Sequence, residues 1–189
     1  MAFSVKIIGY VGSPHKNGNT AFVVKQILKN AKNAETEIYY SSELEVSPCK
    51  GCLWCVDKDK CVINDDMQKI YTSMKKADVL VIGTPIYMGQ MTGRTKVFTD
   101  RLYPQISPCF SPYYNPENAG KKLVLVFTQG NPDITKFQTY IDYTKAMFEM
   151  LEFNVIDVIT VGGTRTTPAS EQKEVSEKLK QTKNLLEVH

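Results

Sequence analysis

The feature that most constrains the fold of this chain is an alternation of short apolar runs with longer amphipathic stretches. The first apolar run, FSVKIIGYVG, contains glycines and is typical of a buried strand that leads into a tight loop. Residues 21–31 then carry apolar side chains at a helical spacing. Further strands are predicted at TEIYY, DVLVIGTP, KLVLVFTQ and NVIDVITVGG. The other predicted helices are DDMQKIYTSMKKA, Thr95 to Tyr103, Ile134 to Leu151 and SEQKEVSEKLKQTKNLLEV.

This alternation predicts the fold class. Nearly continuous apolar strands are buried on both faces, and right-handed crossovers carry each helix back over the sheet. We therefore expect an α/β fold with a doubly wound, five-stranded parallel sheet and helices on both faces. The length of 189 residues fits a single domain, 1–189, with a long Cys-rich loop, 47–65, inserted after the second strand. Ligands of such sheets bind at the carboxyl ends of the strands.

Composition argues against several classes of partner. The chain has 23 Lys and Arg against 20 Asp and Glu, and the basic residues are scattered, so no nucleic acid is expected. The apolar run from Val5 to Val11 is interrupted by Lys6 and is too short to span a membrane. We expect a cytoplasmic protein, whose thiols are kept reduced and whose clustered cysteines bind metal or do redox chemistry.

The first loop, GSPHKNGNT, has the features of a phosphate site. It runs from a strand into a helix, so the amides at the helix start and the hydroxyls of Ser13 and Thr20 point to one anion. Asn17, Gly18 and Asn19 are small or turn-forming, which lets the backbone approach the ligand. An ATP-binding P-loop is excluded, because Asn19 stands where Lys is needed, and the dinucleotide pattern G-x-G-x-x-G is absent. A simple strand-to-helix turn is the alternative.

Three motifs together resemble a known family. GSPHKNGNT, GTPIYMGQMTGRTKVFTDR and PCKGCLWCVDKDKCVINDDM are similar to those of the flavodoxin-like NADPH-dependent FMN reductases, and within them the iron-sulfur flavoproteins. The resemblance covers most of residues 3–165 and implies a flavodoxin-like fold, bound FMN and NAD(P)H as co-substrate. His15 stands where the family usually has Arg. The resemblance also implies a homodimer or homotetramer.

The loops after the third and fourth predicted strands are expected to hold the flavin ring. Pro85 fixes the strand exit, Tyr87 offers an aromatic face, and backbone amides of PIYMG can bond the ring edge. The alternative is that Tyr87 and Met88 only pack on the core. The segment TQGNP is expected to close over the flavin. The predicted cofactor-binding residues are Ser13, His15, Asn17, Gly18, Asn19, Thr20, Pro85, Ile86, Tyr87, Met88, Gly89, Thr128, Gln129 and Gly130.

Four cysteines, Cys49, Cys52, Cys55 and Cys61, have the spacing C-x2-C-x2-C-x5-C. Thiolates three residues apart can reach adjacent irons of a [4Fe–4S] cluster from one loop, with a fourth ligand arriving later. Zinc sites more often use two separated C-x2-C pairs. A redox disulfide between Cys49 and Cys52, or a set of free thiols, is also open. Cys109 is interpreted as a spare thiol.

The sequence gives less information about the charged residues that follow the third and fifth predicted strands. Lys96, Asp100 and Arg101 are interpreted as a solvated face or an ion-paired helix end with a structural role. Arg165, in GGTRTTP, is placed near the ligand rim, within reach of a phosphate of NADPH or a partner chain.

These features predict the function. His15 and His189 are the only histidines, so acyl-transfer catalysis has little support and a cofactor must supply the chemistry. We expect an FMN-dependent oxidoreductase that transfers electrons from NAD(P)H or a protein donor to a quinone, flavin or other acceptor, through a [4Fe–4S] cluster if the cysteines hold one. A non-enzymatic, flavodoxin-like electron carrier and a metal-binding interaction module are the alternatives.

Overall fold

The computed structural model describes residues 5–58, 60–105 and 119–187, so the interpretation of Cys109 lies outside the described residues. The strands are β1 Val5–Val11, β2 Ala34–Tyr40, β3 Val79–Tyr87, β4 Gln90–Met91, β5 Lys122–Thr128 and β6 Asn154–Val161. The α-helices are α1 Asn19–Asn30, α2 Trp54–Lys58, α3 Met67–Lys76, α4 Gly93–Asp100, α5 Gln138–Met150 and α6 Lys173–Glu187. Short 3-10 turns are η1 Tyr103–Gln105 and η3 Ala169–Glu171.

The sheet confirms the predicted fold class and corrects the number of strands. Five parallel strands have the order β2-β1-β3-β5-β6, and β4 pairs antiparallel with β3, which makes six strands rather than five. The extra strand follows from a tight hairpin in which Tyr87 pairs with Gln90. Its two turn residues, Met88 and Gly89, both have positive φ, 49° and 82°. A two-residue turn with positive φ at both positions matches the right-handed twist of the two strands that it connects.

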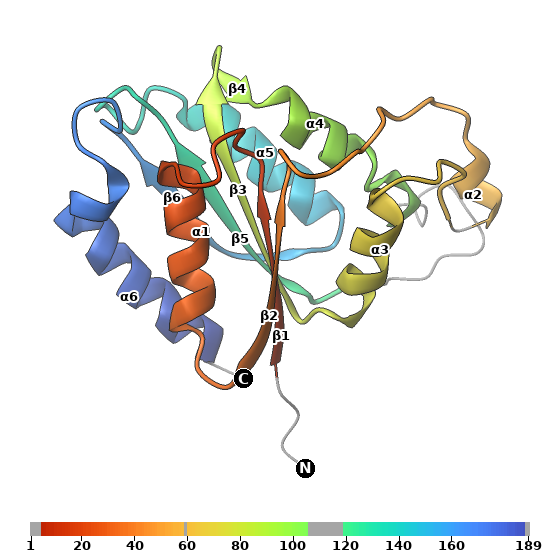
Figure 1. Cartoon of the computed structure of the whole chain (residues 1–189), viewed down its shortest axis with the longest axis horizontal. Coiled ribbons are helices and arrows are strands. Elements are labelled where there is room, and N and C mark those ends of the chain that lie inside the picture. The colour runs from red at the N-terminus through yellow and green to blue at the C-terminus, as the bar shows by residue number, and fades with distance from the viewer. Residues whose placement is uncertain (1–4, 59, 106–118, 188–189) are drawn as a thin grey trace.

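The two faces of the sheet bury two separate hydrophobic clusters. Alternate residues of β1 contribute to each: Ile7 and Val11 belong to the cluster under α1 and α6, and Ile8 and Tyr10 to the cluster under α3, α4 and α5. Figure 1 shows α1 and α6 on the left of the sheet and α3 and α4 on the right. The helices thus cover both faces, and the loops at the carboxyl ends of the strands stay open for a ligand.

The residues between β2 and α3 carry four of the cysteines, and little of this segment is regular. Among its described residues it contains one helix, the five-residue α2, which the sequence pattern did not predict. Figure 1 shows α2 at the right-hand margin, beyond α3 and α4 and away from the sheet. None of the helices within the described ranges combines the length and the apolar character that crossing a bilayer requires.

Candidate functional site

A cavity of about 240 Å³ lies where β1, β3 and β5 end. It gathers most of the residues that the sequence predicts for the cofactor, from three loops far apart in the chain. Its lining residues are Ser13, His15, Gly18, Asn19, Thr20, Pro85, Ile86, Tyr87, Thr128, Gln129, Gly130, Thr164 and Arg165. Three predicted residues do not line it: Asn17 is exposed, and Met88 and Gly89 form the hairpin tip, where Met88 is fully exposed. Met88 and Gly89, at the hairpin turn, are thus not among the residues that line the cavity.

The loop after β1 is fastened to its neighbours through Gly12. The Gly12 amide donates to the carbonyl oxygen of Gly83 at 2.7 Å, and the carbonyl oxygen of Gly12 accepts from the hydroxyl of Thr92 at 2.7 Å. A Cβ atom at Gly12 would lie only 1.8 Å from Oγ1 of Thr95. Glycine is therefore required for the loop to approach α4 this closely.

The start of α1 is suited to an anion. Gly18 is the N-cap residue and supplies no capping side chain, and the first turn contains no acidic residue. The first amides of a helix lack intrahelical partners, and the helix dipole places partial positive charge there. Thr20, in this first turn, and Thr128 are both buried, and their hydroxyl oxygens lie 2.6 Å apart. The two hydroxyls thus join the start of α1 to the end of β5.

Gln129 supplies a buried acceptor that lacks a partner. Its Nε2 donates to the carbonyl oxygens of Asn131 at 3.2 Å and Asp133 at 2.6 Å, which fixes the orientation of the amide group. Its Oε1 is buried and has no hydrogen-bond partner among the described residues. Because a buried acceptor without a partner costs free energy, a ligand with a hydroxyl or N–H donor fits this cavity.

The segment after β6 completes the cavity with two residues. Arg165 was placed near the rim from sequence, and its side chain packs so closely on Gly130 that a Cβ atom there would lie 2.7 Å from it. Thr164 was missed; its hydroxyl donates to the carbonyl oxygen of Gln129 at 3.0 Å. Asn19 holds the same segment by accepting from the amide of Ala169 at 2.8 Å. The only sequence signal was the position of GGTR after a strand.

A second cavity, of about 180 Å³, is lined by all four clustered cysteines. Cys49 and Cys52 are exposed, Cys55 and Cys61 are partly buried, and all four are free thiols. Burial raises the pKa of the Cys55 thiol, and the charges of the other three cysteines raise it further. Within the described ranges, no three Cys, His, Asp or Glu side chains are gathered as metal ligands. The thiols therefore share one cavity without converging on one point.

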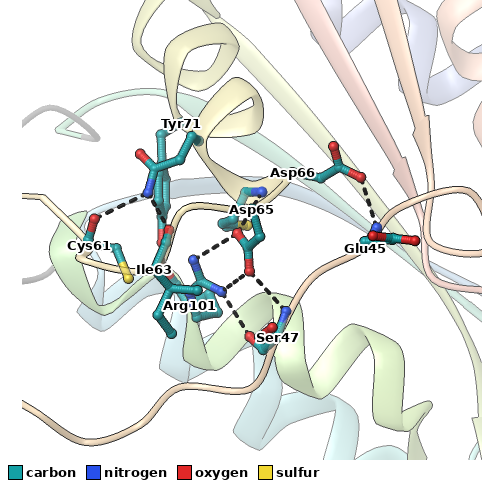
Figure 2. Close-up of polar contacts among 10 residues, drawn as sticks. Glu45, Ser47, Cys61, Ile63, Asp65, Asp66, Tyr71 and Arg101 are labelled. Atoms are coloured by element: carbon teal, nitrogen blue, oxygen red, sulfur yellow. Dashed lines mark hydrogen bonds and ion pairs between the residues drawn. The ribbon is translucent and has the colours of Figure 1, made fainter.

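Ser47 and Asp65, at the two ends of the cysteine segment, meet at what we call its neck. A buried ion pair between Asp65 and Arg101, shown in Figure 2, holds this neck. Nη1 and Nη2 of Arg101 bond the two carboxylate oxygens of Asp65 at 2.7 and 3.0 Å. The amide of Ser47 donates to Asp65 at 2.9 Å, and its carbonyl oxygen accepts from Arg101 at 2.8 Å. Burial alone would raise the pKa of Asp65, but bonds from Arg101 and from the amides of Ser47 and Met67 hold it below its ordinary value.

The structure decides between the two interpretations of the charged end of α4, and the ion-paired, structural one holds. Lys96 and Asp100 do form an exposed ion pair, as one of the sequence alternatives has it. Arg101 does not belong to that solvated face, because its side chain is completely buried against Asp65. The Asp65 carboxylate also accepts from the Met67 amide at 3.0 Å, so it caps α3 while it binds Arg101.

Comparison with known proteins shows the family to which this chain belongs. The sequence model of the NADPH-dependent FMN reductase family matches residues 5–158. An iron-sulfur flavoprotein of Methanosarcina thermophila is 41% identical over 99 residues, which are 51% of this chain and 52% of that protein. One of Methanocaldococcus jannaschii is 37% identical over 102 residues, 53% of each chain. The matched part thus spans about half the length of these curated relatives.

Solved structures show the same fold. An NAD(P)H:quinone oxidoreductase from Methanothermobacter marburgensis superposes with a TM-score of 0.74 at 11% identity, covering 99% of this chain and 100% of that one. An FMN-dependent NADH-azoreductase from Bacillus anthracis, in complex with FMN, gives 0.66 at 14% identity, covering 96% and 99%. The family match confirms the resemblance seen in the sequence motifs: this chain belongs to the NADPH-dependent FMN reductase family.

Proposed function

We propose that this chain is an FMN-dependent oxidoreductase that passes electrons from NAD(P)H or a protein donor to a quinone, a flavin or another acceptor. The observation that carries the proposal is the cavity at the ends of β1, β3 and β5. The start of α1, which has no capping side chain, and Gln129, whose buried Oε1 has no partner among the described residues, both line it. When bound, FMN supplies hydride and electron transfer, so the chain has to bind it, orient it and limit its contact with water.

The phosphate end of FMN is assigned to the loop between β1 and α1. The amides at the start of α1 and the hydroxyls of Ser13 and Thr20 are the donors for a phosphate there. The Oε1 of Gln129 is an acceptor for a hydroxyl or N–H of the cofactor. His15 and Arg165 line the same cavity and add donors near the anion.

The ring of FMN is assigned to the mouth of this cavity. About 240 Å³ is below the roughly 300–1,000 Å³ typical of small-molecule sites, so the cavity fits the phosphate end better than the whole cofactor. Tyr87, which lines the cavity and remains 48% exposed, offers an aromatic face at the mouth. A ring at this open position is accessible to a nicotinamide and to an acceptor.

The four cysteines are assigned to a [4Fe–4S] cluster. Four thiols on one cavity are the donor set that this cluster requires, and the relatives in Methanosarcina thermophila and Methanocaldococcus jannaschii are named iron-sulfur flavoproteins. The thiols do not yet converge, so binding must draw Cys49 and Cys52 inward. Gly51, which lies between them, gives the backbone conformational freedom there, because glycine adopts its positive φ of 62° without strain.

The test is to reconstitute the full chain with FMN without oxygen and to follow oxidation of NADH and of NADPH with a quinone present. We expect stoichiometric FMN and oxidation that depends on both FMN and quinone. Full FMN binding without reaction with either nicotinamide would favour the flavodoxin-like carrier instead. A colourless protein that binds zinc would favour the metal-binding interaction module.

Assembly and location remain predictions from the sequence. We expect a homodimer or homotetramer in the cytoplasm, where reduced thiols are available for the metal. A native mass from light scattering tests the first expectation, and cell fractionation tests the second.

A further inference from the structure

The cysteine segment is tied to the fold at both of its ends. Before the first cysteine, the Ser47 amide and carbonyl bond Asp65 and Arg101. After the last cysteine, Gln68 donates through Nε2 to the carbonyl oxygens of Cys61 at 3.1 Å and Ile63 at 2.6 Å. Figure 2 shows Ser47 and Asp65 bonded to Arg101, with Cys61 and Ile63 nearby. A single cluster of polar side chains thus closes the neck of the segment.

One nitrogen atom of Arg101, Nε, takes no part in these contacts. Its Nη atoms bind Asp65 and Ser47, whereas its Nε is buried and has no hydrogen-bond partner among the described residues. The side chain is completely buried and lines the cavity of the four cysteines. A buried donor without an acceptor is costly and rare, which indicates that something held in this cavity accepts from it. Sulfur is the acceptor that four of the lining residues offer.

We propose that Arg101 is the positioning residue of the cysteine cavity and a donor to its sulfur. Its Nη groups hold the neck of the segment through Asp65 and Ser47, and its Nε–H donates to a cysteine or cluster sulfur when the cavity is loaded. This inference rests on the [4Fe–4S] cluster proposed above. A hydrogen-bond donor and a positive charge favour the more negative, reduced cluster, so Arg101 raises its reduction potential. The carboxylate of Asp65 acts in the opposite direction.

The test measures the midpoint potential of the reconstituted cluster in the full chain, with iron and FMN contents determined on the same samples. Arg101→Lys keeps the charge and removes the Nε donor, so the potential should fall. Loss of a bond to a charged acceptor corresponds to about a tenfold change in the one-electron equilibrium, or about 59 mV. Asp65→Asn removes a negative charge and keeps the donor, so the potential should rise. Lys145→Ala, in an exposed ion pair on α5, is the control and should shift nothing.

The opposite signs separate this role from a merely structural one. If Arg101 only stiffened the segment, both substitutions would loosen the neck and shift the potential in the same direction. The double variant Asp65→Asn with Arg101→Met leaves no unpaired buried charge and covers the case in which Arg101→Lys fails to fold, as judged by lost FMN. Its potential should also fall.

Two results would overturn the inference in distinguishable ways. A wild-type chain that binds FMN but no iron after reconstitution would remove the cluster and this role together. A loaded wild-type chain whose variants share its potential, or shift in one common direction, would remove the role of Arg101 and leave the cluster intact.

Discussion

The loop of residues 12–20 and the segment of residues 47–61 are both assigned to cofactors, but they are held in different ways. The first joins β1 to α1 and is fastened by buried contacts to β3, α4 and β5. The second lies beyond α3 and α4 and is tied mainly at its neck, with Cys49 and Cys52 exposed. The site at the carboxyl ends of the strands takes its geometry from the fold, whereas the cysteine segment is held by the Arg101–Asp65 ion pair and the bonds of Gln68.

This difference has an energetic consequence. Contacts that form with the sheet are present before any cofactor binds, so little ordering remains to be done when FMN arrives. Ligands that do not converge must be drawn together by the metal, and part of its binding free energy is spent on ordering the segment. The two sites should therefore respond independently to substitution.

The largest expected effect is the loss of metal on replacing Cys61 by Ser. With a [4Fe–4S] cluster, the anaerobically reconstituted wild-type chain should hold about four irons, and the variant should hold almost none because the fourth thiolate is missing. FMN content should stay the same, since Cys61 does not line the FMN cavity. Iron and flavin analysis of each sample measures both.

Cys109→Ser provides a matched loss of one thiol outside the clustered spacing. It should retain full iron. Equal iron loss in both variants would mean that Cys61 has no special place in the site.

The next effect concerns stability and tests whether the ion pair is what holds the cysteine segment. Arg101→Met leaves Asp65, whose side chain is 10% exposed, without its partner, and should lower the free energy of unfolding by about 3 kcal/mol. Urea unfolding measures this loss. Lys145→Ala, which breaks only an exposed ion pair, should change it by less than about 0.5 kcal/mol. Similar losses in both variants would argue against a special role for the buried pair.

A comparable but local effect is expected at the first loop. Thr20→Val removes a hydroxyl that contacts Thr128 and lines the cavity, at a cost of roughly 1.5 to 3 kcal/mol if a phosphate accepts from it. FMN affinity should then fall by roughly 10- to 150-fold, measured by fluorescence titration. Thr20→Ser keeps the hydroxyl and should bind FMN nearly as well. Unchanged affinity in the valine variant would remove Thr20 from the site, and lost iron in it would break the proposed independence.

The smallest expected effect is a pH dependence carried by Asp65. Because hydrogen bonds hold its pKa below the ordinary value, the pair stabilises the fold above the unfolded-state pKa of about 3.9, and this contribution is lost as the pH falls through the lower folded-state pKa. The difference in unfolding free energy between wild type and Asp65→Asn should therefore shrink on acidification. Urea unfolding at neutral and acid pH measures it. A difference that stayed constant would show that protonation of Asp65 is not the cause.

The periodicity of the sequence predicted the sheet, its five parallel strands and the loops that meet at their carboxyl ends. It missed β4, because Met88–Gly89 is not the strong turn signal that Asn–Gly would be. Met88 and Gly89 were assigned to the flavin slot through their backbone amides; the structure places them at a hairpin turn, with Met88 exposed, and their contact with the flavin stays a prediction. The position of the loop GSPHKNGNT between a strand and a helix was predictable from the apolar patterns on either side, and the anion assigned to it stays a prediction.

What the sequence determined by itself was local: strands from apolar runs, the first loop from its small residues, and the cysteine group from its spacing. The tertiary structure alone decided which distant residues meet. Arg101 and Asp65 are 36 positions apart, and each resembles an ordinary surface charge until the fold buries them together. Thr164 and Gln129 likewise reach one cavity only because β5 and β6 are neighbours in the sheet. Spacing along a chain reports which groups are near in sequence, whereas burial and pairing across the sheet depend on contacts that form only when the strands assemble.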